Sequence, residues 1–180
     1  WQAGLLDDIK PRLHPSGNKF VGSMVCNDCH DAEYDIWENG VDGDAGPHER
    51  ATRDLIEPGE RTWVKRIYDP ECVSCHATGW NPQEYFPYET GFINLDDDSH
   101  LNGNGCENCH GPGSAHVAAE NDGGDEAMLT RLRQQMIVTK AQAKEKLCYS
   151  CHDLDNSPAY AEAQDGFEKF WPAIAHGEDE

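Results

Sequence analysis

The sequence predicts a mainly α-helical protein with extensive loops, and three observations lead to this fold class. Only 37% of the 180 residues are hydrophobic, which is too little for an ordinary two-layer core of this length. No window shows the sustained alternation of apolar and polar residues that is typical of a half-buried strand, whereas several windows have helical spacing. All eight cysteines fall in four copies of one motif, Cys-x-x-Cys-His. We therefore expect a bound group at these motifs to supply most of the core.

The four motifs are the strongest functional signal. C-x-x-C-H is the attachment signature of c-type haem, in which two thioethers fix the haem and the adjacent histidine binds the iron. The predicted attachment residues are Cys26, Cys29, Cys72, Cys75, Cys106, Cys109, Cys148 and Cys151, and the predicted proximal ligands are His30, His76, His110 and His152. The sequence thus predicts a multihaem c-type cytochrome with four haem c groups and a haem-stack core. We expect no stable fold without haem.

Two other uses of paired cysteines fit less well. Four C-x-x-C pairs could form two four-thiolate zinc sites, or they could staple a secreted domain through disulfides. Neither use explains why a histidine follows every pair. Covalent attachment of four irons instead indicates an electron-transfer protein rather than an enzyme.

Composition and charge limit the partners and the location. The formal net charge is −20, which argues against binding to nucleic acid or to anionic membrane surfaces. No apolar run is long enough to span a bilayer, and no secretory signal is present in the sequence, which begins at Trp1. Because c-type haem is attached on the outer side of energy-transducing membranes, we expect an exported protein, periplasmic or extracellular, whose signal peptide has been removed.

Glycine-rich turns divide the chain into short predicted helices. The clearest is Asp125–Ile137, where Met128, Leu129 and Leu132 share one face, and Thr139 is expected to cap the next helix. The predicted helices are Ala32–Glu38, His48–Ile56, Arg61–Tyr68, Ser114–Glu120, Asp125–Ile137, Lys140–Leu147 and Pro158–Phe170. Tyr85–Asn94 is expected to be a short hairpin or an irregular loop. Residues 20–180 are predicted to form a single tetrahaem domain, and residues 1–19 an N-terminal arm with little to pack against.

The sixth ligand of each iron must come from outside the motifs. Five histidines remain, His14, His48, His100, His116 and His176, and we expect most of them to be distal ligands, which would give saturated irons. His116 follows His110 by six residues, a reach of about 20 Å when fully extended. Because the Gly111-Pro112-Gly113 turn prevents full extension, His116 should ligate a haem other than the one held at His110. His100, which lies six residues before Cys106, is a fifth candidate.

The stretch Cys106–His116 has the sequence Cys-Glu-Asn-Cys-His-Gly-Pro-Gly-Ser-Ala-His. It is similar to the third-haem region of the tetrahaem cytochrome c-554 family, which includes an OmcE-like nanowire branch. Other similar segments are Phe20–Ser23, Tyr34 and Trp37 with His48–Ala51, Cys75–Gly79, and Cys151–Asp153 with Ile174–His176. The resemblance covers nearly the whole chain and departs at an insertion, Asn39–Pro47.

The resemblance implies a mostly helical, loop-rich fold with parallel and perpendicular haem pairs. It also implies that His48, His116 and His176 are distal ligands. In the periplasmic members one haem lacks a distal ligand, and those members accept electrons from an oxidase of reduced nitrogen compounds. In the nanowire branch, tetrahaem cytochromes polymerise into extracellular filaments, and a histidine of one subunit ligates a haem of the next.

We interpret the chain as an electron conduit that polymerises into an extracellular filament, with His14 as the ligand donated in trans. Its partners would be other copies of itself and redox proteins. A monomeric periplasmic shuttle, or a haem enzyme with one open iron acting on small nitrogen compounds, is the alternative. Two acidic runs, Asp42–Asp44 and Asp96–Asp98, could hold calcium, although such runs in so acidic a chain are usually solvated.

Overall fold

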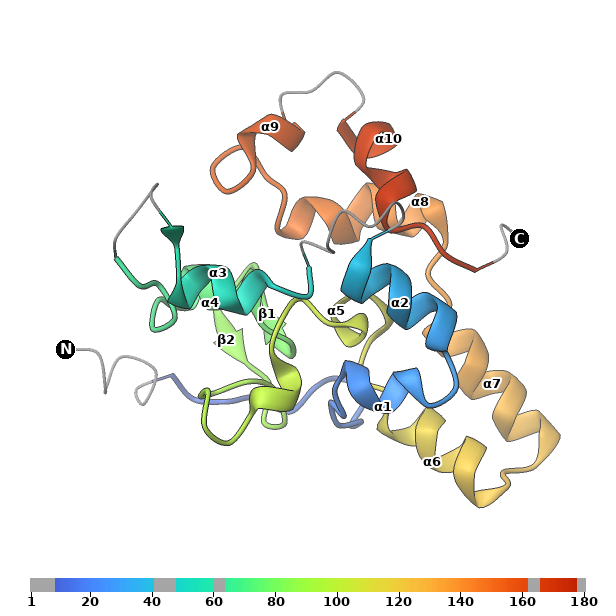
Figure 1. The fold of residues 1–180 in the computed structure, drawn as a ribbon. Coiled ribbons are helices and arrows are strands. Elements are labelled where there is room, and N and C mark those ends of the chain that lie inside the picture. Colours follow the sequence, from blue (N-terminus) through green and yellow to red (C-terminus); the bar gives the residue numbers. More distant parts are fainter. Residues whose placement is uncertain (1–8, 41–47, 60–63, 162–165, 178–180) are drawn as a thin grey trace.

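The computed structural model describes residues 9–40, 48–59, 64–161 and 166–177, and its helices are short (Figure 1). The helices are α1 Ser23–Asn27, α2 Asp31–Asn39, α3 Ala51–Ile56, α4 Pro70–His76, α5 Cys106–His110, α6 Ser114–Asp122, α7 Glu126–Met136, α8 Lys140–Gln142, α9 Pro158–Ala161 and α10 Gly166–Phe170. One antiparallel hairpin pairs β1 Trp80–Asn81 with β2 Phe86–Pro87. The predicted fold class, mainly helical with extensive loops, is confirmed.

Each haem-attachment motif coincides with a short helical segment. The second motif lies in α4 and the third forms α5. The first motif runs from the end of α1 to His30, the N-cap of α2, and the fourth begins with a 3-10 turn, Cys148–Ser150. This arrangement follows from the motif, because residues three apart lie on the same face of a helix. The two cysteines of each motif therefore face the same way, with the histidine one position further along.

The predicted helices are largely correct, with two corrections. The segment Arg61–Tyr68 is not helical over residues 64–68, because the Arg66 N–H donates to the carbonyl of Leu55 across the fold, at 2.9 Å; residues 61–63 lie outside the described part. The predicted helix Pro158–Phe170 is seen as α9 and α10 in the described residues. Thr139 caps α8 in a capping box, and the chain then continues as a π-helical turn, Ala143–Leu147.

The apolar side chains form two small clusters rather than one core. The first lies around the hairpin, α3 and α4, and contains Phe20, Leu55, Ile67, Val73, Ala77, Trp80, Phe92 and Leu101. The second lies between the π-turn and α9–α10, and contains Ala143, Tyr160 and Phe167. In the ribbon, α5 lies between these regions, with α8–α10 on one side and α6–α7 on another (Figure 1). The helix of the third motif is therefore central in the fold.

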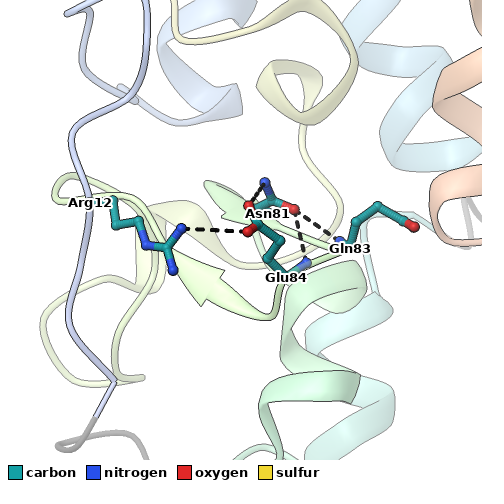
Figure 2. A network of polar contacts seen from close by, with 4 residues as sticks. All are labelled: Arg12, Asn81, Gln83 and Glu84. Carbon is teal, nitrogen blue, oxygen red and sulfur yellow. Dashed lines mark hydrogen bonds and ion pairs between the residues drawn. The ribbon is translucent and has the colours of Figure 1, made fainter.

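The described part of the N-terminal arm packs along the hairpin. Arg12 forms an isolated parallel bridge with Tyr88; the Arg12 N–H donates to the Pro87 carbonyl at 3.1 Å. The Arg12 guanidinium lies 3.8 Å from the centre of the Phe86 ring. It also forms an ion pair with Glu84, at 3.7 Å (Figure 2). The expectation of an arm with little to pack against is wrong for residues 9–18, because the exposed edge of β2 offers it backbone partners.

The loop that joins β1 to β2 is held by Asn81. Its side-chain oxygen accepts hydrogen bonds from the backbone N–H groups of Gln83 and Glu84, at 3.0 and 3.1 Å (Figure 2). The Gln83 amide group in turn donates to the carbonyl of Ser150, at 2.8 Å. A chain of polar contacts therefore connects the arm to the fourth motif.

In the described residues, no helix is long and apolar enough to cross a membrane.

Candidate haem-binding site

Three pairs of histidine rings face each other in the fold, and each pair joins one motif histidine to one histidine from outside the motifs. The ring centres of His30 and His116 are 6.4 Å apart, with 32° between the planes. Those of His152 and His48 are 6.0 Å apart at 49°. Those of His110 and His176 are 5.7 Å apart at 44°. The partner of each motif histidine comes from a distant part of the chain.

This spacing fits one metal ion between two imidazoles. Two imidazoles on opposite sides of a metal, each at a bond length of about 2 Å, place their ring centres roughly 6 Å apart. Side-chain charge also suits ligation, because burial lowers the pKa of His48 to about 4 and lowers the pKa of His110 and His152. These rings are therefore neutral at pH 7, which is the form that binds a metal ion.

Hydrogen bonds to Nδ1 orient several of these rings. Nδ1 of His110 lies 2.6 Å from the carbonyl of Met136 at the end of α7, and Nδ1 of His76 lies 2.8 Å from the carbonyl of Ala51. Nδ1 of His176 lies 2.8 Å from the carbonyl of Ile174. A carbonyl can only accept, so each Nδ1 carries the proton and Nε2 keeps its lone pair for the iron.

His116 on α6 has a different environment. Its Nδ1 is buried without a hydrogen-bond partner and lies 3.7 Å from the carboxylate of Glu120. Arg133 of α7 binds both oxygens of that carboxylate, at 2.7 and 2.8 Å. Burial lowers the pKa of His116, which keeps this ring neutral as well.

His76 is the one motif histidine that no histidine ring faces within the described residues. The two other predicted candidates lie elsewhere. His100 is in an exposed 3-10 turn, Ser99–Leu101. The ring of His14 contacts Phe20 and Tyr88 edge-on, with centres 5.8 and 4.7 Å apart. The structure thus brings three of the five predicted distal candidates, His48, His116 and His176, face to face with motif histidines.

The cysteines of different motifs also meet in pairs. All eight are free thiols, as thioether attachment requires. The thiols of Cys26 and Cys106 lie close enough to interact, which lowers the pKa of Cys106 to about 7, and the thiols of Cys75 and Cys151 interact as well. The first motif therefore lies against the third, and the second against the fourth. Over the described chain, no group of three or more His, Cys, Asp or Glu side chains is arranged around one metal ion, so the four-thiolate zinc arrangement is not formed.

A cavity of about 500 Å³ lies between the third and fourth motifs. The ring pair His48–His152 lines it, together with the thiols of Cys109 and Cys148 and the aromatic side chain of Trp171. Its lining is mostly apolar, which suits a porphyrin, and thiols and imidazoles meet within it. The residues present therefore fit haem c.

Three polar side chains that hold the motifs together were not predicted from the sequence. Asn108, between the cysteines of the third motif, accepts from the Gly79 N–H and donates to the Ala77 carbonyl, both at 3.0 Å. Thr52 donates to the His76 carbonyl at 2.6 Å. Glu107, beside Asn108, is only 2% exposed, and burial raises its pKa. Asn108 and Glu107 lie inside a motif, but their contacts could not be predicted, because the partner groups come from other segments of the chain.

In the described part of the chain, the acidic run Asp96–Asp98 does not form a metal-binding cluster. The carboxylate of Asp98 accepts hydrogen bonds from the N–H groups of Ile93 and Asn94, at 2.8 and 3.0 Å, so it closes its own loop. Asp42–Asp44 lies outside the described residues.

Comparison with known proteins points to one family. Residues 25–111 match the family model described as cytochrome c554 and c-prime. The chain is 25% identical to cytochrome c-554 of Nitrosomonas europaea over 170 residues, which is 86% of this chain and 66% of that protein. It is 33% identical to the multihaem cytochrome MtrA of Shewanella baltica over 100 residues, which is 53% of this chain and 28% of that protein.

Among solved structures, the reduced state of cytochrome c554 from Nitrosomonas europaea aligns with 75% of this chain and 65% of its own, at 24% identity and a TM-score of 0.43. The chain thus spans just under two thirds of the length of cytochrome c-554 and a smaller part of MtrA. Both curated relatives are cytochromes, and the four C-x-x-C-H motifs of this chain are the attachment signature of haem c. Over residues 25–111, the chain is similar to the cytochrome c554 and c-prime family.

Proposed function

We propose that this protein carries electrons through four covalently bound haem c groups, of which at least three have histidine on both sides. The observation that carries the proposal is the set of three ring pairs, with centres 5.7 to 6.4 Å apart. Bound haem supplies reversible one-electron chemistry at its iron, and two histidine ligands favour a low potential and a saturated coordination sphere. The chain's own residues fix where each haem lies.

Each ligand has a separate role in this proposal. His30, His76, His110 and His152 are the proximal ligands, and the paired cysteines hold the haems covalently. His116, His176 and His48 are the distal ligands of the haems held at His30, His110 and His152. Because each distal ligand comes from a distant segment, ligation also holds the fold together.

Intact-mass spectrometry of the purified holoprotein tests this proposal. The expected result is a polypeptide mass increased by four haem groups, and peptide mapping should find one haem on each motif. A polypeptide with no added prosthetic mass would contradict it.

For the haem held at His76, we propose a ligand from a second copy of the chain. His14 is not paired with any motif histidine of its own chain, and it lies on the N-terminal segment, which suits donation in trans. The protein would then be an exported, extracellular cytochrome whose copies polymerise into a filament and exchange electrons with redox partner proteins. At a net charge of −20, such copies associate only if ligation or added salt offsets their repulsion.

Donation by His14 requires a local rearrangement. The Ser16 N–H donates to Nδ1 of His14, at 3.2 Å, so the neutral ring carries its proton on Nε2. Ligation through Nε2 needs this contact to break. Electron microscopy of wild-type protein and of His14→Ala tests the idea: filaments are expected only from wild type. Filaments from His14→Ala would rule out this ligand.

A periplasmic electron shuttle, or a haem enzyme acting on small nitrogen compounds, is the second candidate. Two observations favour it. No histidine ring of the described residues faces His76, and the chain is similar to cytochrome c-554. In this case the monomer keeps one high-spin haem that binds carbon monoxide or nitric oxide. Optical spectra of the isolated monomer and of assembled material separate the two candidates, because the trans ligand removes the high-spin component on assembly.

A further inference from the structure

Glu107 is a buried carboxylate inside the third haem-attachment motif. It is 2% exposed, and the corresponding positions of the other motifs hold Asn27, Val73 and Tyr149. A charged side chain in the interior is costly unless it is fully hydrogen-bonded. Its contacts therefore indicate what it holds.

Three backbone amides from two distant segments converge on this carboxylate. The Val21 N–H donates to both oxygens at 3.0 Å, and the Gly22 N–H donates to Oε2 at 2.8 Å. The Gly113 N–H donates to Oε1 at 2.7 Å. Charge-assisted hydrogen bonds of this kind are among the strongest in proteins. Glu107 thus acts as one shared acceptor for three amides from two chain segments.

The segments that it joins lead directly to one ligand pair. Gly22 is the N-cap of α1, which carries Cys26 and leads to His30. Gly113 is the N-cap of α6, which carries His116. The rings of these two histidines face each other at 6.4 Å. One carboxylate therefore connects the segments on both sides of this ring pair.

The backbone of Gly22 lies so close to the His100 carbonyl that this position requires glycine. Gly22 has φ +87°, and a side chain there would bring Cβ to 2.5 Å from the His100 carbonyl, so only glycine fits. The contact between α1 and α5 is also reciprocal, since the Ser23 hydroxyl accepts from the Cys106 N–H at 3.2 Å. Hydrogen bonds in both directions therefore join the first and third motifs: Glu107 accepts from the segment before α1, and Ser23 of α1 accepts from Cys106.

We propose that Glu107 is a positioning residue that sets the gap between His30 and His116 and the placement of the first motif against the third. This inference rests on the proposed haem ligation by that histidine pair. The hydrogen bonds of the side chain all come from backbone amides, and none joins it to His30 or His116. It acts through the backbone of α1 and α6.

Glu107→Gln tests the proposal in the holoprotein. Glutamine keeps the size, but its NH₂ group faces amide donors, so at least one buried N–H loses its acceptor. We expect four haems per chain, a new high-spin ferric component equal to one haem, and at least tenfold faster hydrogen exchange at Val21, Gly22 and Gly113. The new component should match the one that His116→Ala produces. Asp28→Asn, which neutralises an exposed carboxylate within the first motif, should behave as wild type.

Glu107→Asp keeps the experiment decisive if the glutamine variant fails to mature. Aspartate retains both oxygens with a shorter reach, so a smaller change of the same kind is expected. Unchanged spectra and exchange in Glu107→Gln would overturn the proposal, as would equal loss of haem from all four motifs in both variants. A wild-type protein without a low-spin haem at His30 would contradict the proposed function instead, while amide exchange would still test the contacts of Glu107.

Discussion

At the scale of single residues, two kinds of side chain define the site. Histidines from distant segments face the motif histidines, and polar groups such as the half-buried Asn108 hold the motifs in register. The sequence predicted the first kind, because the motifs indicate haem and haem iron needs axial ligands. It did not identify the second kind, because Glu107 and Asn108 occupy the unspecified positions of C-x-x-C-H, and only the fold brings their hydrogen-bond partners to them.

Replacing His116 by alanine should convert one haem to the high-spin state. Its ring is the partner of His30 at 6.4 Å, and no other histidine ring faces His30 in the described chain. Electron paramagnetic resonance of the oxidised protein measures the change as one of four haems. His100→Ala is the matched control, since His100 is exposed and unpaired with any described ring, and its spectrum should equal that of wild type. A spectrum of His116→Ala without a high-spin signal would remove His116 from the ligand set.

At the scale of elements, short helices are held by caps and by their neighbours. α7 is capped by Asp125, whose carboxylate accepts a hydrogen bond from the Met128 N–H at 2.8 Å. The helix ends beside the third motif, where the Met136 carbonyl accepts from His110. The pattern of this helix was predictable from its own sequence. The role of its last carbonyl was not, because that contact joins residues 26 positions apart.

Asp125→Ala should destabilise α7. Loss of an N-cap costs about 1 kcal/mol in free energy of unfolding, and chemical denaturation of the holoprotein measures it. Asp122→Ala, a nearby exposed carboxylate in α6, should cause no loss. Equal stability of the Asp125 variant and wild type would show that the cap contributes nothing.

α10 should loosen from α8 at acidic pH. Lys140 and Lys144 bind the two oxygens of Glu168, at 2.9 and 3.0 Å, and these contacts lower its pKa. A depressed carboxyl pKa stabilises the fold above the ordinary value of about 4.3, and the contribution is lost as the pH falls through the folded-state pKa. The effect is small and screened by salt, because the groups are exposed.

Hydrogen exchange over Gly166–Phe170 measures this loosening. Glu168→Gln should show faster exchange already at pH 7, whereas Glu145→Gln, an exposed carboxylate of the π-turn, should not. Exchange that is independent of both pH and Glu168 would disprove the contribution of these ion pairs.

At the scale of the whole molecule, the chain has no single apolar core in its described residues. Its buried apolar residues form one cluster beside the hairpin and a small one near α10, and ligand pairs bridge the segments that surround α5. Composition alone indicated this deficit. The pairing of the first motif with the third and the second with the fourth could not be read from the sequence, because it depends on thiol contacts between helices far apart in the chain.

Chain made without haem should not fold cooperatively. Replacing all eight motif cysteines by serine removes attachment while leaving every histidine in place. We expect little helical circular dichroism and no cooperative thermal transition, because ligation links segments that otherwise share few apolar contacts. A cooperative transition like that of the holoprotein would show that the polypeptide supplies its own core.

The ligand pairs themselves are tested most directly by counting haem spin states in the oxidised monomer. Low-temperature electron paramagnetic resonance with spin integration gives the number of low-spin, bis-histidine haems per chain. We predict at least three, assigned to His30, His110 and His152 by single substitutions of His116, His176 and His48. Two or more high-spin haems in the wild-type protein would contradict the assignment of these three histidine pairs.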